Sequence, residues 1–530
     1  MKNYITRPLI SKPGIQRDGT PFASQSYIDG QWCRFYMGRP RKIGGYQLID
    51  IGNTEIIRSL FGVPQNNSVD VYLGRASSVN YNNFDFNGVG SGEIDRTPSG
   101  YVPDENNIWN FALFTDNNGD QPGSQIVASV IPNGADVSNT TNGPLYYGNT
   151  DTTSPLQPIY YEDGTTPVMV SGGIVALPTV MVAFGNNGLV QWSNIGDTTK
   201  WSTLDNIIVD NTKVIKAFPT RGSTAQQLIV WTLSSVLNLT YDATNKTFSS
   251  STIQDNITVM SPNSIIEYNQ QFFWVGIDQF YFFNGIVQRL DNSMSTDWFF
   301  QNINLNERSK VWGMVIPRYK ELWWFYPRNT IDPVTQEVIF TATECNACVI
   351  YNTELNVWYD SMITRAAGLS PGIFPYPLMS DSQKETVPSG RGVVNNYGLW
   401  MHEFGFDQII SGIPLAIDSF FETHIITLFE NNPENNRLIR TRRIEPDLAQ
   451  IGDMAITVNN RMFPSDTIEN SQLIQTGPFT FTPNTQKIDN INSQGRLVSF
   501  VFDSNTIGGV YQAGQTLLDY EIGDVQPGSN

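Results

Sequence analysis

Residues 321–360 read ELWWFYPRNTIDPVTQEVIFTATECNACVIYNTELNVWYD. Short runs of aromatic and β-branched residues alternate here with Pro, Asn, Asp and Thr, which is typical of two or three β-strands joined by turns. Tryptophan lies near both ends, and no polar constellation in the stretch suggests catalysis. Similar units recur through the middle of the chain, and this recurrence is the strongest information in the sequence.

The recurrence has a period near 40 residues. Strand–turn–strand patterns occupy residues 176–193, 226–242, 270–285 and 395–405 as well as the opening stretch. Successive gaps of 39, 43, 50, 34 and 42 residues separate six tryptophans, Trp192, Trp231, Trp274, Trp324, Trp358 and Trp400. Several short strands per unit at this spacing predict a β-propeller. The count is about six blades if residues 55–75 and 395–410 share one blade that closes the ring. A β-sandwich array with chance spacing is the alternative.

Composition supports an all-β fold of more than one domain. The chain has 530 residues, of which 40% are hydrophobic, 12% aromatic and only 15% charged. This length exceeds one typical domain, and the hydrophobic content is ample for a core. After position 414 the rhythm changes to alternating strands every 10–14 residues, which predicts a C-terminal β-sandwich of about seven strands.

Three regions are therefore expected. Residues 1–50 form a basic N-terminal arm with docking strands, residues 51–413 the propeller, and residues 414–530 the sandwich. Within the propeller, two stretches rich in Asn and Gly, around 76–107 and 115–142, are interpreted as polar insertions.

Charge is distributed unevenly. Residues 1–42 hold eight basic and two acidic residues, a net of +6, which leaves −24 for the remainder of a chain whose net charge is −18. The acidic surface argues against a nucleic-acid-binding face. A basic end on an acidic body either contacts an acidic partner or is a solvated terminus. The candidate assembly contacts in this segment are Arg7, Lys12, Arg17, Arg34, Arg39, Arg41 and Lys42.

A second basic cluster lies in the predicted sandwich, where Arg440, Arg442 and Arg443 alternate along a predicted strand. They are candidates for binding a neighbour's acidic face. Alternatively, they are exposed on an edge strand, where charge discourages aggregation.

Neither a cofactor nor a metal site is predicted. Cys345 and Cys348 form an isolated CxxC without the second half of a zinc site, so structural thiols in a β-turn are expected. His402, with Glu403 and Asp407, lacks the second histidine of an HExxH motif, so a structural turn closing the last blade is favoured.

An enzyme is not expected either. The sequence has no GxSxG motif and no Walker-type loop, and its arginines occupy no repeated blade position that would suggest a sialidase-like cluster. Trp323, Trp324, Phe325 and Tyr326 suit either a sugar-stacking platform or a core between blades, and the core is favoured. MKNYITRPLI lacks the apolar region of a signal peptide, and no apolar run reaches transmembrane length, which predicts synthesis in a cytoplasm.

Several segments, taken in order, resemble one family. They are AFGNNGLVQWSNIGDTTKWSTL, QQLIVWTLSSVLNLTY, FFWVGIDQFYFFNGIVQRL, ELWWFYP and VIYNTELNVWYDSMITRAA, with RKIGGY, IWNFALF, IVASV, GPLYYG, LWMHEFGFD, QGRLVSFVFDSN and YQAGQTLLD outside that run. The chain from about residue 27 to 525 resembles the tail hub or nozzle proteins of short-tailed, podovirus-type bacteriophages, also called stabilization proteins. The specificity lies in the order of the segments, since no single motif is catalytic or unique.

The resemblance implies a structural virion protein of the viral tail, assembled in the host cytoplasm. Its subunits would form a hexameric tube below the portal–adaptor complex, hold the tail together and conduct the genome during ejection. Implied partners are identical subunits, the tail adaptors, and distal needle or fibre proteins, with transient, non-specific passage of DNA. An acidic channel wall would repel phosphates and let DNA slide. A propeller-based receptor- or glycan-binding protein of the virion surface is the alternative.

Overall fold

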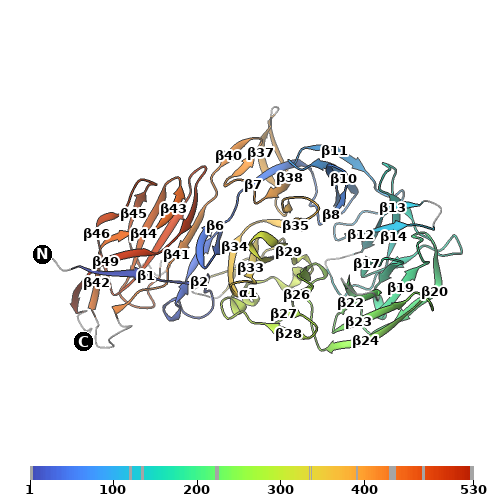
Figure 1. Ribbon diagram of the computed structural model, residues 1–530, viewed down its shortest axis with the longest axis horizontal. Coiled ribbons are helices and arrows are strands. Elements are labelled where there is room, and N and C mark those ends of the chain that lie inside the picture. Colours follow the sequence, from blue (N-terminus) through green and yellow to red (C-terminus); the bar gives the residue numbers. More distant parts are fainter. Residues whose placement is uncertain are drawn as a thin grey trace.

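The computed structural model describes residues 4–118, 122–132, 136–220, 226–332, 335, 337–389, 392–428, 437–467 and 472–525. Figure 1 shows a ring of β-sheets beside an elongated β-sandwich, with the first and last strands, β1 (Ile5–Leu9) and β49 (Thr516–Val525), both in the sandwich. The described residues contain one α-helix, α1 (Thr296–Asn302). The short 3-10 helices include η1 (Pro21–Ala23), η2 (Asn186–Gly188), η3 (Pro262–Ser264), η4 (Leu305–Lys310) and η5 (Pro317–Tyr319). The prediction of a nearly all-β chain, with a propeller-like domain followed by a sandwich, is confirmed.

The first four sheets of the ring are four antiparallel blades in chain order. Blade 1 is β8 (Ser59–Pro64), β9 (Ser68–Gly74), β10 (Val79–Asp85) and β11 (Gly90–Asp95); blade 2 is β12 (Ile108–Asp116), β13 (Gly123–Ile131) and β14 (Gly143–Asn149), with β15 (Gln157–Pro158) and β16 (Met169–Val170); blade 3 is β17 (Gly173–Ala176), β18 (Met181–Phe184), β19 (Leu189–Ser193) and β20 (Trp201–Ile208); blade 4 is β21 (Val214–Pro219), β22 (Gln226–Thr232), β23 (Ser235–Asp242) and β24 (Thr247–Asp255).

Three further blades complete the ring. Blade 5 is β25 (Ile266–Tyr268), β26 (Gln271–Val275), β27 (Phe280–Phe283) and β28 (Val287–Leu290); blade 6 is β29 (Trp312–Ile316), β30 (Glu321–Tyr326), β33 (Ala347–Asn352) and β34 (Val357–Met362), with the hairpin β31 (Thr330–Ile331) and β32 (Val338–Phe340); blade 7 is β35 (Arg365–Leu369), β36 (Leu378–Asp381), β38 (Gly392–His402) and β7 (Tyr46–Asn53), with β37 (Glu385–Ser389), β39 (Gln408–Ile410) and β40 (Ile413–Leu415).

The first strands of the blades lie against one another around an axis. Contacts join β8 to β12, β12 to β17, β17 to β21, β25 to β29, β29 to β35, and β35 back to β8. Blades 4 and 5 share a core that contains Trp231 and Trp274. The described part of the chain thus forms seven blades, one more than expected.

Strand β30 shows why blades of this composition stack. All six of its residues are buried. Leu322, Trp324 and Tyr326 join the core shared with blade 5, whereas Trp323 and Phe325 face the opposite way, into the core shared with blade 7 and the sandwich. Because successive side chains of a strand point to opposite faces, an uninterrupted apolar run requires a neighbour on both sides of its sheet.

The strand that closes the ring differs from the expected one. Tyr46–Asn53, in β7, lies between β38 and β39 in blade 7 and pairs with β38, with Tyr46 opposite His402. Residues 59–74 do not share that blade; they begin blade 1 as β8 and β9. Closure by an N-terminal strand ties the start of the propeller sequence to its end.

The region around 76–107, expected to be a polar insertion, contains half of blade 1. Strands β10 and β11 cover residues 79–95, because β10 has apolar residues for both of its faces: Val79 and Tyr81 join the core shared with blade 2, and Phe84 joins the core shared with blade 7. The stretch 115–142 likewise contains β13, whose central residues are buried. Residues 119–121 and 133–135, within the second predicted insertion, lie outside the described residues.

The sandwich is built from both ends of the chain. Its sheets are β1 (Ile5–Leu9)–β49 (Thr516–Val525)–β42 (Arg437–Glu445)–β46 (Ile488–Gly495), β4 (Asp29–Gln31)–β41 (Ser419–Glu422)–β47 (Leu497–Ser504)–β44 (Met454–Arg461)–β45 (Ile474–Phe481), and β43 (Leu448–Ile451)–β48 (Val510–Ala513)–β6 (Arg39–Lys42)–β5 (Cys33–Tyr36). β2 (Lys12–Ile15) pairs with β3 (Ser26–Tyr27) in parallel.

The N-terminal segment is therefore not a free arm. β1 pairs with β49, β4 with β41 and β6 with β48, so the segment supplies strands to all three sandwich sheets. In Figure 1 the blue N-terminal strands run among the orange and red C-terminal strands and between them and blade 6. This packing places the basic side chains of the segment at the junction of the two domains.

Candidate functional site

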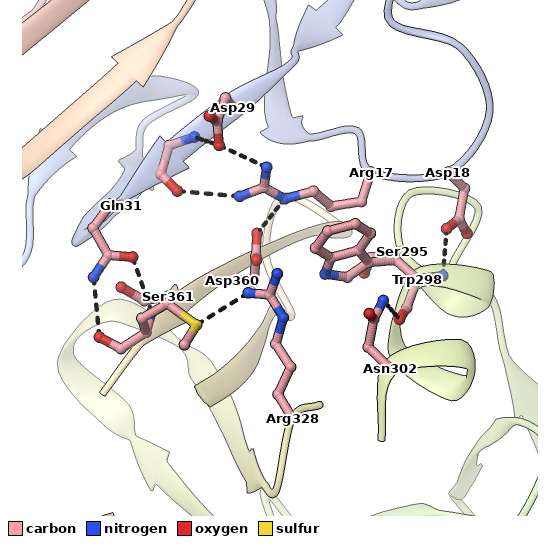
Figure 2. A network of polar contacts seen from close by, with 12 residues as sticks. Arg17, Asp18, Asp29, Gln31, Ser295, Trp298, Asn302, Arg328, Asp360 and Ser361 are labelled. Atoms are coloured by element: carbon pink, nitrogen blue, oxygen red, sulfur yellow. Dashed lines mark hydrogen bonds and ion pairs between the residues drawn. The ribbon is translucent and has the colours of Figure 1, made fainter. Parts of the chain in front are cut away.

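The junction between the N-terminal segment and blade 6 is held by a polar network centred on Arg17 (Figure 2). The Arg17 guanidinium donates to Asp360 of β34 at 2.9 Å, to Asp29 at 2.6 Å and to the Gly30 carbonyl at 3.3 Å. Burial alone would lower the pKa of Arg17, but Asp360 and Asp29 more than offset this effect and raise it. Arg17 is therefore a fixed cation paired within its own chain.

Helix α1 is held by Asp18, the residue that follows Arg17 in the chain. The Asp18 carboxylate accepts the backbone N–H groups of Asp297 and Trp298, at 3.0 and 2.7 Å, at the start of α1 (Figure 2). Acidic groups at this end of a helix satisfy free N–H donors. The Trp298 ring lies between the guanidinium groups of Arg17 and Arg328, at 5.6 and 4.6 Å. The network thus joins the N-terminal segment to two elements of the propeller, β34 and α1.

A second ionic centre lies deeper. Arg34 of β5 is 1% exposed and makes ion pairs with Glu321 of β30, at 2.9 Å, and with Glu403, which follows β38, at 2.6 Å. Its guanidinium also lies 3.6 Å from the ring centroid of Tyr319. Burial would lower the pKa of Arg34, but Glu321 and Glu403 raise it. One side chain of the N-terminal segment thereby connects blades 6 and 7.

The ten basic residues predicted as assembly contacts are distributed unevenly. Arg34 and Lys42 are buried, at 1% and 2% exposure, so neither can touch a partner. The prediction that these two residues are assembly contacts is therefore corrected. The physical reason is that β5 and β6 are interior strands of the junction. Lys12 is exposed, and the half-buried residues are Arg7, Arg17, Arg39, Arg41, Arg440, Arg442 and Arg443.

The arginines of β42 have partners within their own sheet. Arg440 bonds Asp524, Arg442 bonds Glu521 and Arg443 bonds Asp519, each at 2.7–2.8 Å. All three acidic residues belong to β49. Strand β42 lies between β49 and β46, so the edge-strand interpretation is wrong.

His402 and its neighbours are tied into the closure of blade 7. His402 Nε2 accepts a hydrogen bond from Arg365 Nε at 3.0 Å, and its ring stacks on Tyr46 with centroids 4.9 Å apart. Burial lowers its pKa, and the positive charge of Arg365 lowers it further. Glu403 pairs with Arg34, and Asp407 accepts the Gly508 N–H. These contacts fit the expected structural role.

The cysteines and the aromatic run are also interior. Cys345 and Cys348 are 1% and 0% exposed, and burial raises the pKa of both thiols. Cys348 lies in strand β33, not in the turn expected from sequence. Residues 323–326 are buried in β30, so the core interpretation is confirmed and the stacking platform is wrong. Among the described residues, no group of His, Cys, Asp or Glu side chains is placed to hold a metal ion.

The propeller axis holds a cavity that the sequence did not reveal. Its volume is about 420 Å³, and all seven blades line it, blade 5 through residues just before β25 and the others through their first strands. The lining includes Arg58, Asn110, Lys216, Phe218 and Asn263. These residues stand at no common position of a recognisable motif, and only the closing of the ring brings them together. No sequence signal identified them.

One glycine permits the close approach of the N-terminal segment to blade 6. Gly14 has φ of +95°, and a Cβ there would lie 2.5 Å from Met294 Sδ and 3.1 Å from the Trp358 carbonyl oxygen. We expect Gly14→Ala to lower the free energy of unfolding by about 1–3 kcal/mol beyond the backbone strain. Chemical denaturation would measure it.

Gly19→Ala is the matched control, because Gly19 has φ of +81° and a Cβ at that position would meet no atom within 4 Å. Both variants carry similar backbone strain, so their difference reports the close packing alone. Equal destabilisation of the two variants would show that Gly14 is not constrained by blade 6.

Comparison with known proteins adds no argument about the fold or the activity of this chain. No family model matches the chain, and no curated protein matches it. Among solved structures, a candidate 6-phosphogluconolactonase from Bacteroides uniformis has a TM-score of 0.37 and 11% identity, covering 61% of this chain and 92% of its own. YCF48 from Cyanidioschyzon merolae has a TM-score of 0.37 and 9% identity, covering 68% and 99%. Similarity this distant carries no inference about activity.

Proposed function

We propose that this protein is a structural subunit of the tail of a short-tailed bacteriophage, acting as the hub or nozzle below the portal and its adaptors. The observation that carries the proposal is the ordered set of family-like segments. They fall on blades 2–6, on the closing strands of blade 7, and on β47–β49 of the sandwich. The resemblance therefore covers both domains.

The junction between the domains supports a mechanical role. The N-terminal segment supplies strands to the sandwich, β7 to blade 7, and Arg17 and Arg34 to ion pairs with blade 6. One apolar core runs from the sandwich into blades 6 and 7. A subunit that transmits load along a tail benefits from such continuity, because a large apolar interface restrains relative domain motion.

A genome conduit would lie between subunits, not within one. The axial cavity of about 420 Å³ has the volume of a small-molecule site. A DNA duplex, whose major groove alone is about 12 Å wide, does not pass through it. In the proposed hexamer, the acidic surfaces of six subunits would face the conduit and repel phosphates. A lumen lined by Lys and Arg would contradict this part of the proposal.

Exposed apolar side chains supply surface for contacts between subunits. On the β31–β32 hairpin of blade 6, Val338, Ile339 and Phe340 are 52%, 64% and 50% exposed, and on β40 Ile413 is 60% exposed. Adjacent exposed apolar residues are common at protein–protein interfaces. The adaptors and the distal needle or fibre proteins are the other proposed partners.

No helix in the described ranges has the length and apolar character needed to cross a membrane.

Native mass spectrometry tests the proposal on the purified protein. We expect a ring, or a hexamer that forms when the adaptor is added, with six copies of the 59.4 kDa chain. A monomer at all concentrations, with or without adaptor, that binds defined sugars on a glycan array would contradict the tail role and support a receptor-binding protein. The burial of the aromatic run in β30 removes the feature that most favoured glycan binding.

A further inference from the structure

The axial cavity has a lining charge opposite to that of the protein. The chain carries a net charge of −18, yet the described residues around the cavity include two cations, Arg58 and Lys216, and no carboxylate. The positive charge of Arg58 is balanced by Glu344: the Arg58 guanidinium donates two hydrogen bonds to the Glu344 carboxylate, of 3.0 and 2.8 Å. Lys216 is the remaining positive charge.

Lys216 has no polar partner among the described residues. Its ammonium lies 5.5 Å from the ring centroid of Phe218, on the same strand, and makes no hydrogen bond or ion pair within those ranges. Burial lowers the pKa of this lysine to about 8. Lys216 is half-buried. A partly desolvated ammonium without a counter-ion carries a free-energy cost, and a ligand that supplies the opposite charge would relieve it.

The rest of the lining suits a small organic molecule. Phe61, Trp109, Phe111 and Trp312 supply aromatic surface, and the side-chain amides of Asn110 and Asn263 make no hydrogen bond with the described residues. The volume of about 420 Å³ falls within the ~300–1,000 Å³ of small-molecule sites. A lining that combines aromatic surface with polar groups and one unpaired cation is complementary to a flat body that carries an oxyanion.

We propose that the axial cavity binds a small organic anion, a carboxylate or phosphate ester on an apolar, planar body, with Lys216 as its charge partner. Asn110 and Asn263 are the additional donors on the lining. The cavity is separate from the junction contacts, so the proposal of an anion site does not depend on the proposed tail role.

Isothermal titration calorimetry with benzoate, phenyl phosphate and neutral benzyl alcohol tests the assignment at pH 7. We expect wild-type protein to bind at least one anion and to bind benzyl alcohol at least about tenfold more weakly. Benzoate and phenyl phosphate distinguish the carboxylate from the phosphate source. Binding of neither anion, or equal binding of benzyl alcohol, would overturn the proposal.

Lysine variants locate the site. Lys216→Gln should weaken anion binding at least about tenfold, whereas Lys246→Gln, in an exposed turn of the same blade, should leave it unchanged. Lys216→Gln removes an unpaired, half-buried charge, so we expect its melting temperature to stay at or above that of the wild type. Retained binding in a folded Lys216→Gln variant would contradict the assignment.

The pH dependence provides an independent signature. Since the protonated lysine binds the anion and its pKa is about 8, wild-type affinity should fall about tenfold between pH 7 and pH 9. Lys216→Arg keeps its charge throughout this range, so its affinity should not change with pH. The same pH dependence in both proteins would rule out Lys216 as the charge partner.

Discussion

Arg34→Ala is expected to lower the free energy of unfolding by about 3–5 kcal/mol. The substitution leaves Glu321, which is 0% exposed, and Glu403 without the cation that both contact. A buried carboxylate without a partner costs far more than an exposed one. Chemical denaturation, followed by tryptophan fluorescence, measures the change.

Two further variants separate the charge from the packing. Arg34→Met combined with Glu321→Gln and Glu403→Gln should recover much of the loss, because no unpaired charge remains. Arg440→Ala is the matched control: its pair with Asp524 is 34% and 85% exposed, so we expect a loss below about 1 kcal/mol. A loss for Arg34→Ala as small as that of the control would mean that the junction does not depend on this ion pair.

Trp324→Ala should lower the free energy of unfolding by about 3–5 kcal/mol through lost packing. Trp324 is 0% exposed, packs against Phe280 and Trp358 at centroid distances of 5.6 and 5.9 Å, and donates its indole N–H to the Ser264 carbonyl at 2.8 Å. The substitution removes contacts between blades 5 and 6 and leaves a cavity. Thermal and chemical unfolding both report the loss.

Phe86→Ala is the control for removal of an aromatic ring, because Phe86 is 42% exposed in the turn between β10 and β11. We expect it to change stability by less than about 0.5 kcal/mol. If Trp324→Ala left the melting temperature unchanged but abolished binding of a ligand, the residue would belong to a site and not to the core.

The blades were predictable where apolar residues fill both faces of a strand, and harder to see elsewhere. The tryptophan spacing used Trp324 and Trp358 as separate markers of the repeat, yet they stack within blade 6. Strands β10 and β11 were also hidden, because Asn and Gly residues lie among their few buried apolar residues and lower the apolar content of the stretch. The count was about six because residues 55–75 and 395–410 were assigned to one blade, whereas residues 59–74 begin blade 1 and β7 closes blade 7.

The junction was predicted only in part. The concentration of positive charge in the N-terminal segment is visible in the sequence, and acidic partners were expected. For Arg17 and Arg34 those partners are Asp360, Glu321 and Glu403 of the same chain, hundreds of residues away. Sequence patterns over short windows do not show such contacts. The axial cavity was equally hidden, because Lys216 acquires its surroundings only when seven blades converge.

Electron microscopy of the assembled particle tests the tail role most directly. The account predicts six copies of this chain in a ring below the portal and adaptors, around a channel whose wall is predominantly acidic. Copies located only on the outer surface of the particle, outside any ring around the channel, would contradict it.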